Sequence, residues 1–310
     1  MKYLGLRILA SAVVVFLLLA IHLIAPLRGG LWLQTFYDSL HVPLFGIIAV
    51  CVLVITPTNW SRPKRILAII AAVATLGILS EIAEIPTGRD ASFRDLLANW
   101  FGAAGFLAVA IVFSSNLSVP KGRGRYLAIL GIGLIAWPLI PLAKVSAAYL
   151  DRNQWLPELV SFDSRFGNLF YYGQNAKVRT IRRAASRSLV AEVSLADGPR
   201  PGIVFHDLWP NWEPYSTLVI EVENPESESL LINIHVTDQI HSLGDRAYGE
   251  RFDMTHTLQP GRNTLQFPLE LLRNAPEARR MDLSQIDRMV VSCSSKYAGR
   301  VLNVIAIRLE

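Results

Sequence analysis

Ionisable and amide side chains are concentrated in the segment SEIAEIPTGRDASFRDLLANWFG, which lies between two long apolar runs. Glu81 and Glu84 stand about one helical turn apart, Arg89 follows them, and Asp95 and Asn99 again have helical spacing. A carboxylate near a substrate can act as a general base, and a guanidinium can hold a phosphate group. The spacing therefore raises the hypothesis of chemistry on a phosphate-bearing substrate.

A second acid and an imidazole, Asp38 and His41, precede this segment and lie three residues apart. In a catalytic interpretation, Glu81 or Glu84 is the base and His41 or Asp38 is the acid. However, the sequence contains no nucleophile elbow, phosphate loop or metal motif. Carboxylates paired with arginine also serve structural roles, so we assign no catalytic residue and keep Glu81 and His41 as candidates. The predicted polar membrane cluster comprises Asp38, His41, Glu81, Glu84, Arg89, Asp95 and Asn99.

The first 150 residues contain the apolar runs that would position this cluster. The chain of 310 residues is 52% hydrophobic and 18% charged, whereas soluble domains average about 25% charged residues. A membrane-spanning helix needs roughly 20 apolar residues. We therefore predict a helical membrane domain over residues 1–150 with five transmembrane helices. The five predicted helices cover residues 8–26, 42–56, 66–85, 96–113 and 126–150.

Lysine and arginine clusters predict the orientation of these helices. Such clusters lie before the first run, between the second and third runs, and between the fourth and fifth runs. Cytoplasmic loops are enriched in these residues. The pattern predicts a cytoplasmic N-terminus, location in the cytoplasmic (inner) membrane of a bacterium, and an extracytoplasmic chain after residue 150.

The motif Glu81-x-x-Glu84, Arg89, Asp95-x-x-x-Asn99-x-x-Gly102-x-x-Gly105, together with Asp38 and His41, resembles the signature of the VanZ-like membrane family. The resemblance covers roughly residues 30–115. That family is associated with resistance to glycopeptide antibiotics, and its biochemical activity is not settled. The resemblance therefore implies a membrane module of the cell envelope rather than a particular reaction.

The remaining residues have the pattern of an all-β domain. A polar connector at residues 151–164 is followed by short alternating runs separated by turn sequences such as ADGPRPG and QPGRN. We predict a jelly-roll β-sandwich over residues 165–310, with one short helix at 269–274. The predicted strands cover residues 188–195, 203–206, 218–222, 230–236, 264–267, 289–293 and 301–307.

The stretch FHDLWPNWEPYSTL and the later stretch VTDQIHSLGDRAYGERFDMTHTL resemble segments of galactose-binding-like, carbohydrate-binding jelly rolls. The resemblance implies a saccharide site, in which flat aromatic faces lie beside rigid hydrogen-bonding groups. The alternative is structural, with the tryptophans in the core and the charged groups paired with one another. The candidate ligand-binding residues are Trp209, Trp212, Tyr215, Asp238, His241 and Arg251.

The sequence predicts neither a cofactor nor a metal site, since no Cys/His spacing or calcium motif occurs. The net charge of +5 forms no basic stripe with interleaved aromatics, so we expect no nucleic-acid partner. We predict a non-catalytic envelope protein that presents a glycan-binding sandwich, with the lipid bilayer and envelope polysaccharide as partners. The alternative is a membrane enzyme, or an accessory subunit of polysaccharide export, that acts on lipid-linked saccharides. A channel or transporter is disfavoured because no internal repeat is found.

Overall fold

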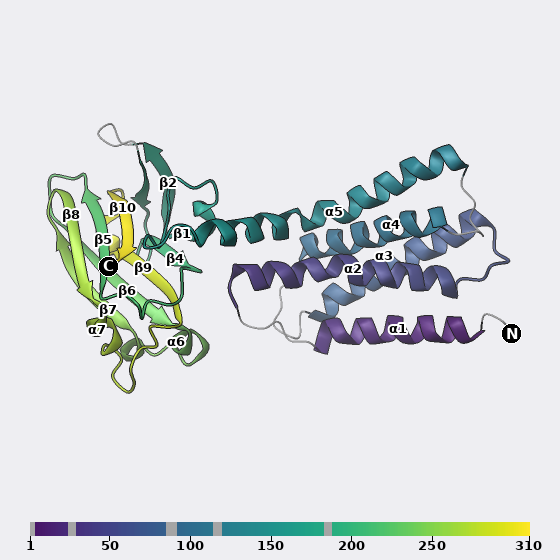
Figure 1. The fold of residues 1–310 in the computed structure, drawn as a ribbon, viewed down its shortest axis with the longest axis horizontal. Helices are drawn as coiled ribbons and strands as arrows, with labels where there is room; N and C mark the ends of the chain where they lie inside the picture. Colours follow the sequence, from purple (N-terminus) through teal and green to yellow (C-terminus); the bar gives the residue numbers. More distant parts are fainter. Residues whose placement is uncertain (1–3, 24–28, 85–91, 114–119, 183–187) are drawn as a thin grey trace. The chain divides into compact units, whose positions relative to one another are not determined.

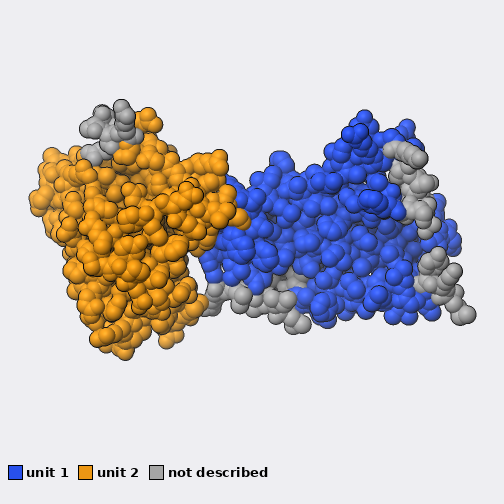
Figure 2. Space-filling model, in the orientation of Figure 1, with its two compact units in different colours: residues 1–145 blue, residues 146–310 orange. Residues whose placement is uncertain are grey.

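The computed structural model describes residues 4–23, 29–84, 92–113, 120–182 and 188–310. The chain divides into two compact units, residues 1–145 and residues 146–310, which are coloured separately in Figure 2. The first unit is helical and the second is built of β-strands, as Figure 1 shows.

Five long helices form the N-terminal half of the chain. They are α1 (Leu4–Leu23), α2 (Leu31–Ile55), α3 (Arg62–Glu84), α4 (Phe93–Phe113) and α5 (Lys121–Arg152). Among the described residues, four helical segments are long and apolar enough to cross a membrane, whereas the apolar part of α1, Leu4–Ala20, is shorter. The four segments are Leu31–Ile55, Pro63–Ala83, Phe93–Phe113 and Gly122–Arg152.

Helix α2 begins eleven residues before the predicted start at residue 42, so it carries Asp38 and His41 within its length. The polar residues there obscured the apolar run, yet two of them, Thr35 and Ser39, fit a helix because their side chains bond to its own backbone. The hydroxyls of Thr35 and Ser39 each donate to the carbonyl four residues earlier, at 2.7 Å. Pro43 lies inside the helix as well.

Small residues let α4 approach its neighbours closely. A Cβ added to Gly102 would lie 2.2 Å from the carbonyl oxygen of Val42 on α2, and one added to Gly105 would lie 2.7 Å from the carbonyl oxygen of Gly131 on α5. Both contacts are between backbones, which is the way that small residues pack helices in membranes. Gly102 and Gly105 therefore have a packing role in the first unit.

The second unit contains two five-stranded antiparallel sheets (Figure 1). One sheet has the order β1-β4-β9-β6-β7 and the other β2-β3-β10-β5-β8. The strands of the first sheet are β1 (Tyr171–Gln174), β4 (Gly202–His206), β9 (Ile286–Cys293), β6 (Leu230–Asp238) and β7 (Phe252–Leu258). Those of the second are β2 (Ala176–Arg182), β3 (Leu189–Leu195), β10 (Val301–Leu309), β5 (Thr217–Asn224) and β8 (Gly261–Pro268).

The strand order of β3 to β10 is jelly-roll-like, because consecutive strands alternate between the two sheets, apart from β6 and β7, which are neighbours in one sheet. Both inner faces are apolar, and their side chains form one buried core. The C-terminal strand β10 lies at the centre of its sheet, between β3 and β5. The sandwich thus depends on pairing between the two ends of its own sequence.

The predicted count of five transmembrane helices and one short helix is corrected, since the described residues form seven α-helices, the five long ones and two others. The two others are five-residue helices in the second unit, α6 (Gln239–Leu243) and α7 (Leu269–Arg273). The sequence indicated α7 but not α6, which is a single capped turn after β6. Strands β1, β2 and β7 were also missed, because their exposed positions interrupt the apolar alternation.

The last turns of α5 belong to the second unit. Tyr149 donates its hydroxyl to Asp207 at 2.6 Å, and Arg152 donates to the backbone carbonyls of Asp207 and Leu208. The Arg152 guanidinium also lies 5.7 Å from the ring centroid of Phe170. These contacts attach the last turns of α5 to the rest of the second unit.

Candidate functional sites

A buried chain of hydrogen bonds joins three helices of the first unit. His41 Nδ1 lies 2.9 Å from Asn99 Oδ1, and Asn99 Nδ2 donates to Glu81 Oε1 at 3.4 Å. The second oxygen of Glu81 accepts the backbone N–H of Ser92, just before α4, at 3.0 Å. Asn99 is fully buried, and Glu81 and His41 are 6% and 9% exposed. The structure thus brings together one predicted residue from each of α2, α3 and α4.

The close contact between α2 and α4 sets this geometry. Val42 follows His41, and Gly102 lies one turn beyond Asn99, so the backbone contact of Val42 with Gly102 adjoins the side-chain bond. Hydrogen-bonded polar groups in an apolar helix bundle stabilise a single arrangement of the helices. We interpret His41, Asn99 and Glu81 as a polar cluster that fixes the packing.

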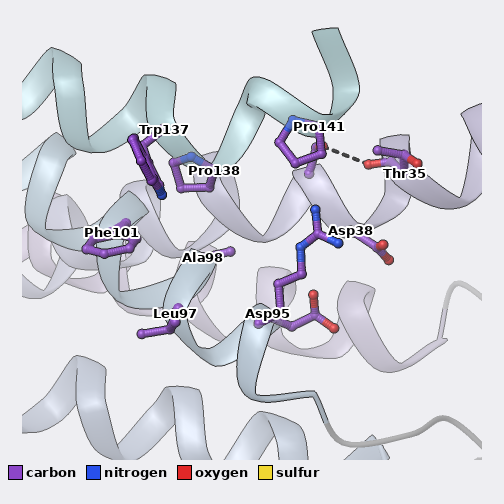
Figure 3. A pocket seen from close by; sticks show the side chains of 11 residues that line it. Thr35, Asp38, Asp95, Leu97, Ala98, Phe101, Trp137, Pro138 and Pro141 are labelled. Atoms are coloured by element: carbon purple, nitrogen blue, oxygen red, sulfur yellow. Dashed lines mark hydrogen bonds between the residues drawn. The ribbon is translucent and has the colours of Figure 1, made fainter. Parts of the chain in front are cut away.

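A separate cavity of about 220 Å³ lies between α2, α4 and α5. In the view of Figure 3, Asp38 and Asp95 lie toward one end, and Phe101 and Trp137 lie toward the other. Its lining residues are Thr35, Asp38, Ser39, Arg94, Asp95, Leu97, Ala98, Phe101, Trp137, Pro138 and Pro141. The predicted polar cluster is therefore divided: His41, Glu81 and Asn99 form a buried chain, while Asp38 and Asp95 line a cavity. Arg89 and the side chain of Glu84 lie outside the described residues.

The structure places the tryptophan candidates of the sandwich in structural positions. Trp212 is fully buried and donates its indole N–H to the carbonyl oxygen of Trp209 at 2.7 Å. Trp209 and Tyr215 pack against the same core and are partly buried. The interpretation of Trp212 as a ligand contact is therefore corrected, because its ring has no exposed face.

Asp238 is likewise a buried structural carboxylate. It caps α6 by accepting the backbone N–H of His241 at 2.9 Å, and it accepts a second backbone N–H from Asp282 at 2.8 Å. Arg279 donates to both of its oxygens, at 2.5 and 2.8 Å. Burial acts to raise the pKa of Asp238, but the bonds from Arg279 and the two amides outweigh it and hold the pKa below its usual value. Asp238 has no exposed surface, so its assignment as a ligand contact is corrected. His241, which adjoins it in α6, is 8% exposed.

Arg251 is the predicted residue that lies beside an open groove. Its guanidinium donates to Asp253 Oδ2 at 2.8 Å and lies 4.4 Å from the ring centroid of Tyr248. Asp253 also accepts the side-chain amide of Asn233 at 2.5 Å. Tyr248 is 62% exposed, so its ring is available at the surface while its position is restrained by Arg251.

The groove follows the outward face of the sheet β1-β4-β9-β6-β7 and encloses about 210 Å³. The strand register brings Asn233 opposite Thr255 on one side and Ser292 on the other. The residues that line the groove are Arg200, Leu231, Ile232, Asn233, Tyr248, Asp253, Thr255, Ser292, Cys293 and Ser294. An exposed aromatic ring therefore stands beside amide, carboxylate, hydroxyl and guanidinium groups.

Electrostatics set the charge states of the polar groups on this face at neutral pH. Burial, together with the nearby charge of Arg251, lowers the pKa of His235 to about 4, so its imidazole is neutral at pH 7. Burial would raise the pKa of Asp253, but its bonds from Asn233 and Arg251 lower it overall. The groove thus presents an ionised carboxylate with fixed partners.

Asn233, Asp253 and Thr255 were not predicted from the sequence. The alternation in LLINIHV carried the signal, because it turns Asn233 away from the core on a strand whose apolar residues face inward. Within the described part of the chain, no group of three or more His, Cys, Asp or Glu residues is arranged to hold a metal ion.

Neither a protein-family model nor a curated protein matches the chain. The β-sandwich is similar to several solved structures. One is a family 11 carbohydrate-binding module from Clostridium thermocellum in complex with a β-1,3-1,4-mixed-linked tetrasaccharide, at 18% identity and a TM-score of 0.39, covering 49% of this chain and 93% of that chain. Another is an exo-β-agarase, at 15% identity and a TM-score of 0.40, where the match covers 49% of this chain but 24% of that one. A third is the CBM22-1–GH10 part of xylanase 10B from Clostridium thermocellum with xylohexaose, at 7% identity and a TM-score of 0.35, covering 49% and 28% of the two chains. TM-scores of this size do not establish a shared ligand or activity.

Proposed function

We propose that this chain is a multi-pass protein of the bacterial cytoplasmic membrane whose β-sandwich binds envelope saccharides outside the cytoplasm. The observation that carries the proposal is the groove on the outward face of the β1-β4-β9-β6-β7 sheet. It combines an exposed tyrosine ring with a fixed set of hydrogen-bonding groups.

The chemistry of the groove suits a sugar ring. A pyranose has an apolar face of C–H groups that can pack on the Tyr248 ring, and hydroxyls at its edge that need donors and acceptors. Asn233 and Asp253 offer these groups in a geometry that is already fixed by hydrogen bonds. Preorganised groups lose little conformational entropy when a ligand binds.

The membrane half supports the location in this proposal through the length and apolarity of its helices. The distribution of lysine and arginine favours a cytoplasmic N-terminus and an external sandwich. The buried chain of His41, Asn99 and Glu81, together with the VanZ-like spacing, supports a packed membrane module rather than an enzyme. The three residues lie outside the lining of the 220 Å³ cavity, so a substrate there would not contact them.

Binding is tested with the full chain in nanodiscs on an array of bacterial and plant polysaccharides. We expect binding to one glycan class, and we expect Tyr248→Ala to weaken it by about two- to tenfold, because packing of a sugar face on the tyrosine ring contributes about 0.5–1.5 kcal/mol. Leu271→Ala, which changes an exposed apolar residue on α7 outside the groove, serves as the control. Equal binding by wild type and Tyr248→Ala would refute the groove as the site, and no binding to any glycan would refute the function.

Location is tested separately by protease treatment of spheroplasts that carry the chain with a C-terminal epitope. We expect loss of the epitope without lysis. Protection of the epitope until lysis would contradict an external sandwich.

A further inference from the structure

The cavity between α2, α4 and α5 is separate from the saccharide groove and holds a different set of groups. We propose that it binds the phosphoethanolamine headgroup of a phospholipid, with the primary amine at its carboxylates and the phosphate at its guanidinium. The inference rests on the membrane location given in the proposed function, and its test separates the two.

The cavity lies at the depth of lipid headgroups. Helix α4 has 21 residues and is therefore about 31 Å long, close to the roughly 30 Å thickness of a hydrocarbon core. Arg94 and Asp95 are in the first turn of this helix, which places them at the membrane–water boundary. Leu97, Ala98 and Phe101 line the cavity further along the same helix, toward the hydrocarbon.

The charges of the cavity match a zwitterion. Asp38 comes from α2, and Arg94 and Asp95 come from α4, so the lining supplies two carboxylates and one guanidinium. A primary ammonium can donate three hydrogen bonds, which suits two carboxylates on facing helices. A guanidinium binds phosphate oxygens with strong, charge-assisted bonds. An anionic headgroup that lacks an amine would be repelled by the same carboxylates.

The size and the apolar end of the cavity favour a lipid over a free solute. A cavity of about 220 Å³ has room for roughly seven water molecules, each with one non-hydrogen atom. Phosphoethanolamine has about eight non-hydrogen atoms, so its size is similar to that of the cavity. The opposite end is formed by Phe101, Trp137 and Pro138, and Trp137 is 68% exposed on α5 (Figure 3). Tryptophan at this depth commonly contacts the glycerol and upper acyl region of lipids.

The experiment starts by incorporating the full chain into liposomes of phosphatidylethanolamine, phosphatidylglycerol and phosphatidylcholine in equal parts. Resistance to alkaline extraction first reports membrane insertion, and failure at this step refutes the proposed function itself. Inserted protein is then extracted in mild detergent, and retained lipid is identified by native mass spectrometry. We expect one retained phosphatidylethanolamine, in about tenfold excess over either competitor.

Two variants and one lipid series test the assignment of the groups. The double variant Asp38→Asn with Asp95→Asn should remove the preference for phosphatidylethanolamine, while Asp245→Asn, at an exposed acid of the sandwich, should retain it. Because the double variant could misfold, wild type is also tested with mono- and dimethylated phosphatidylethanolamine. Retention should fall with each methyl group, since each removes one N–H donor. Equal retention of all lipids, retention that rises with methylation, or equally strong competition by water-soluble glycerophosphoethanolamine would each overturn the proposal.

Discussion

The buried carboxylate of Asp238 gives the sharpest test of how the sandwich is stabilised. The substitution Asp238→Asn keeps an oxygen that can accept the His241 amide and cap α6, but it removes the charge that faces Arg279. The new amide N–H₂ would then replace Oδ2, so it would face both the Arg279 guanidinium and the N–H of Asp282. A structural role for Asp238 therefore predicts a large loss of stability.

The magnitude follows from the contacts. Removing one partner of a buried ion pair typically costs about 3–5 kcal/mol. Arg279 is 21% exposed, so water screens part of its charge, and we take the lower end, about 3 kcal/mol. The second unit has about 165 residues, a size at which 1 kcal/mol shifts Tm by about 2–4 °C. The expected decrease in Tm is about 6–12 °C, and Asp238→Ala should add about 1 kcal/mol through loss of the cap.

The assay is differential scanning calorimetry of the full chain in nanodiscs, with Asp245→Asn as a control for the same chemical change at an exposed position. The stabilising effect of Asp238 should also depend on pH. Its pKa in the folded protein is depressed, so its contribution is complete above the unfolded pKa of about 3.9 and is lost as pH falls through the folded value. A decrease in Tm below 2 °C for Asp238→Asn at pH 7 would refute this reasoning.

Three further predictions concern packing, an imidazole and a thiol. Gly102→Ala should lower the free energy of unfolding of the helical unit by about 1–3 kcal/mol, because the new methyl meets the Val42 carbonyl. Gly133→Ala, inside α5 with open space around it, should instead raise it by up to about 1 kcal/mol, and thermal far-UV circular dichroism in nanodiscs distinguishes the two variants. The folded pKa of His235, about 4, lies below its unfolded value, so the free energy of unfolding should fall by up to roughly 3 kcal/mol as pH falls from about 6.5 to 4. The ring resonances of His235 should titrate below pH 5, and a midpoint near 6.5 would exclude the burial seen here. In a Cys51→Ser background, Cys293, whose pKa burial raises to about 12, should resist maleimide at pH 8 until the sandwich is unfolded, and rapid labelling of the folded protein would contradict its position.

Local patterns predicted much of the fold. Long apolar runs marked the helices, and alternation marked seven of the ten strands. The start of α2 was placed too late, because Asp38 and His41 interrupt the apolar run even though they belong to the helix. Strand β7, with sequence FDMTHTL, was missed because it pairs with β6 along its backbone and needs few apolar side chains to do so.

The contacts that a singled-out residue makes were harder to predict than the residues themselves. The sequence singled out both Trp212 and Asp238, but a tryptophan near a turn can face a ligand or fill a core, and only the packing decides. The counter-ion of Asp238 is Arg279, which lies 41 residues later and has no local signal. By contrast, Asn99 and Glu81 lie on adjacent helices joined by a short connection, so their helical spacing already indicated that they could meet.

The central place of β10 has a consequence for the order of biosynthesis. Strands β3 and β5 each pair with β10, and the last residue, Glu310, accepts backbone bonds from Ser216 and Thr217. A nascent chain that lacks residues 301–310 therefore has two strands, β3 and β5, that each lack one of their two neighbours in the sheet. The helices can be complete long before that point, so the sandwich is expected to close only after β10 has emerged from the ribosome. Chaperones that shield exposed strand edges would act during this interval, and C-terminal truncation by even one strand should send the protein to proteolysis.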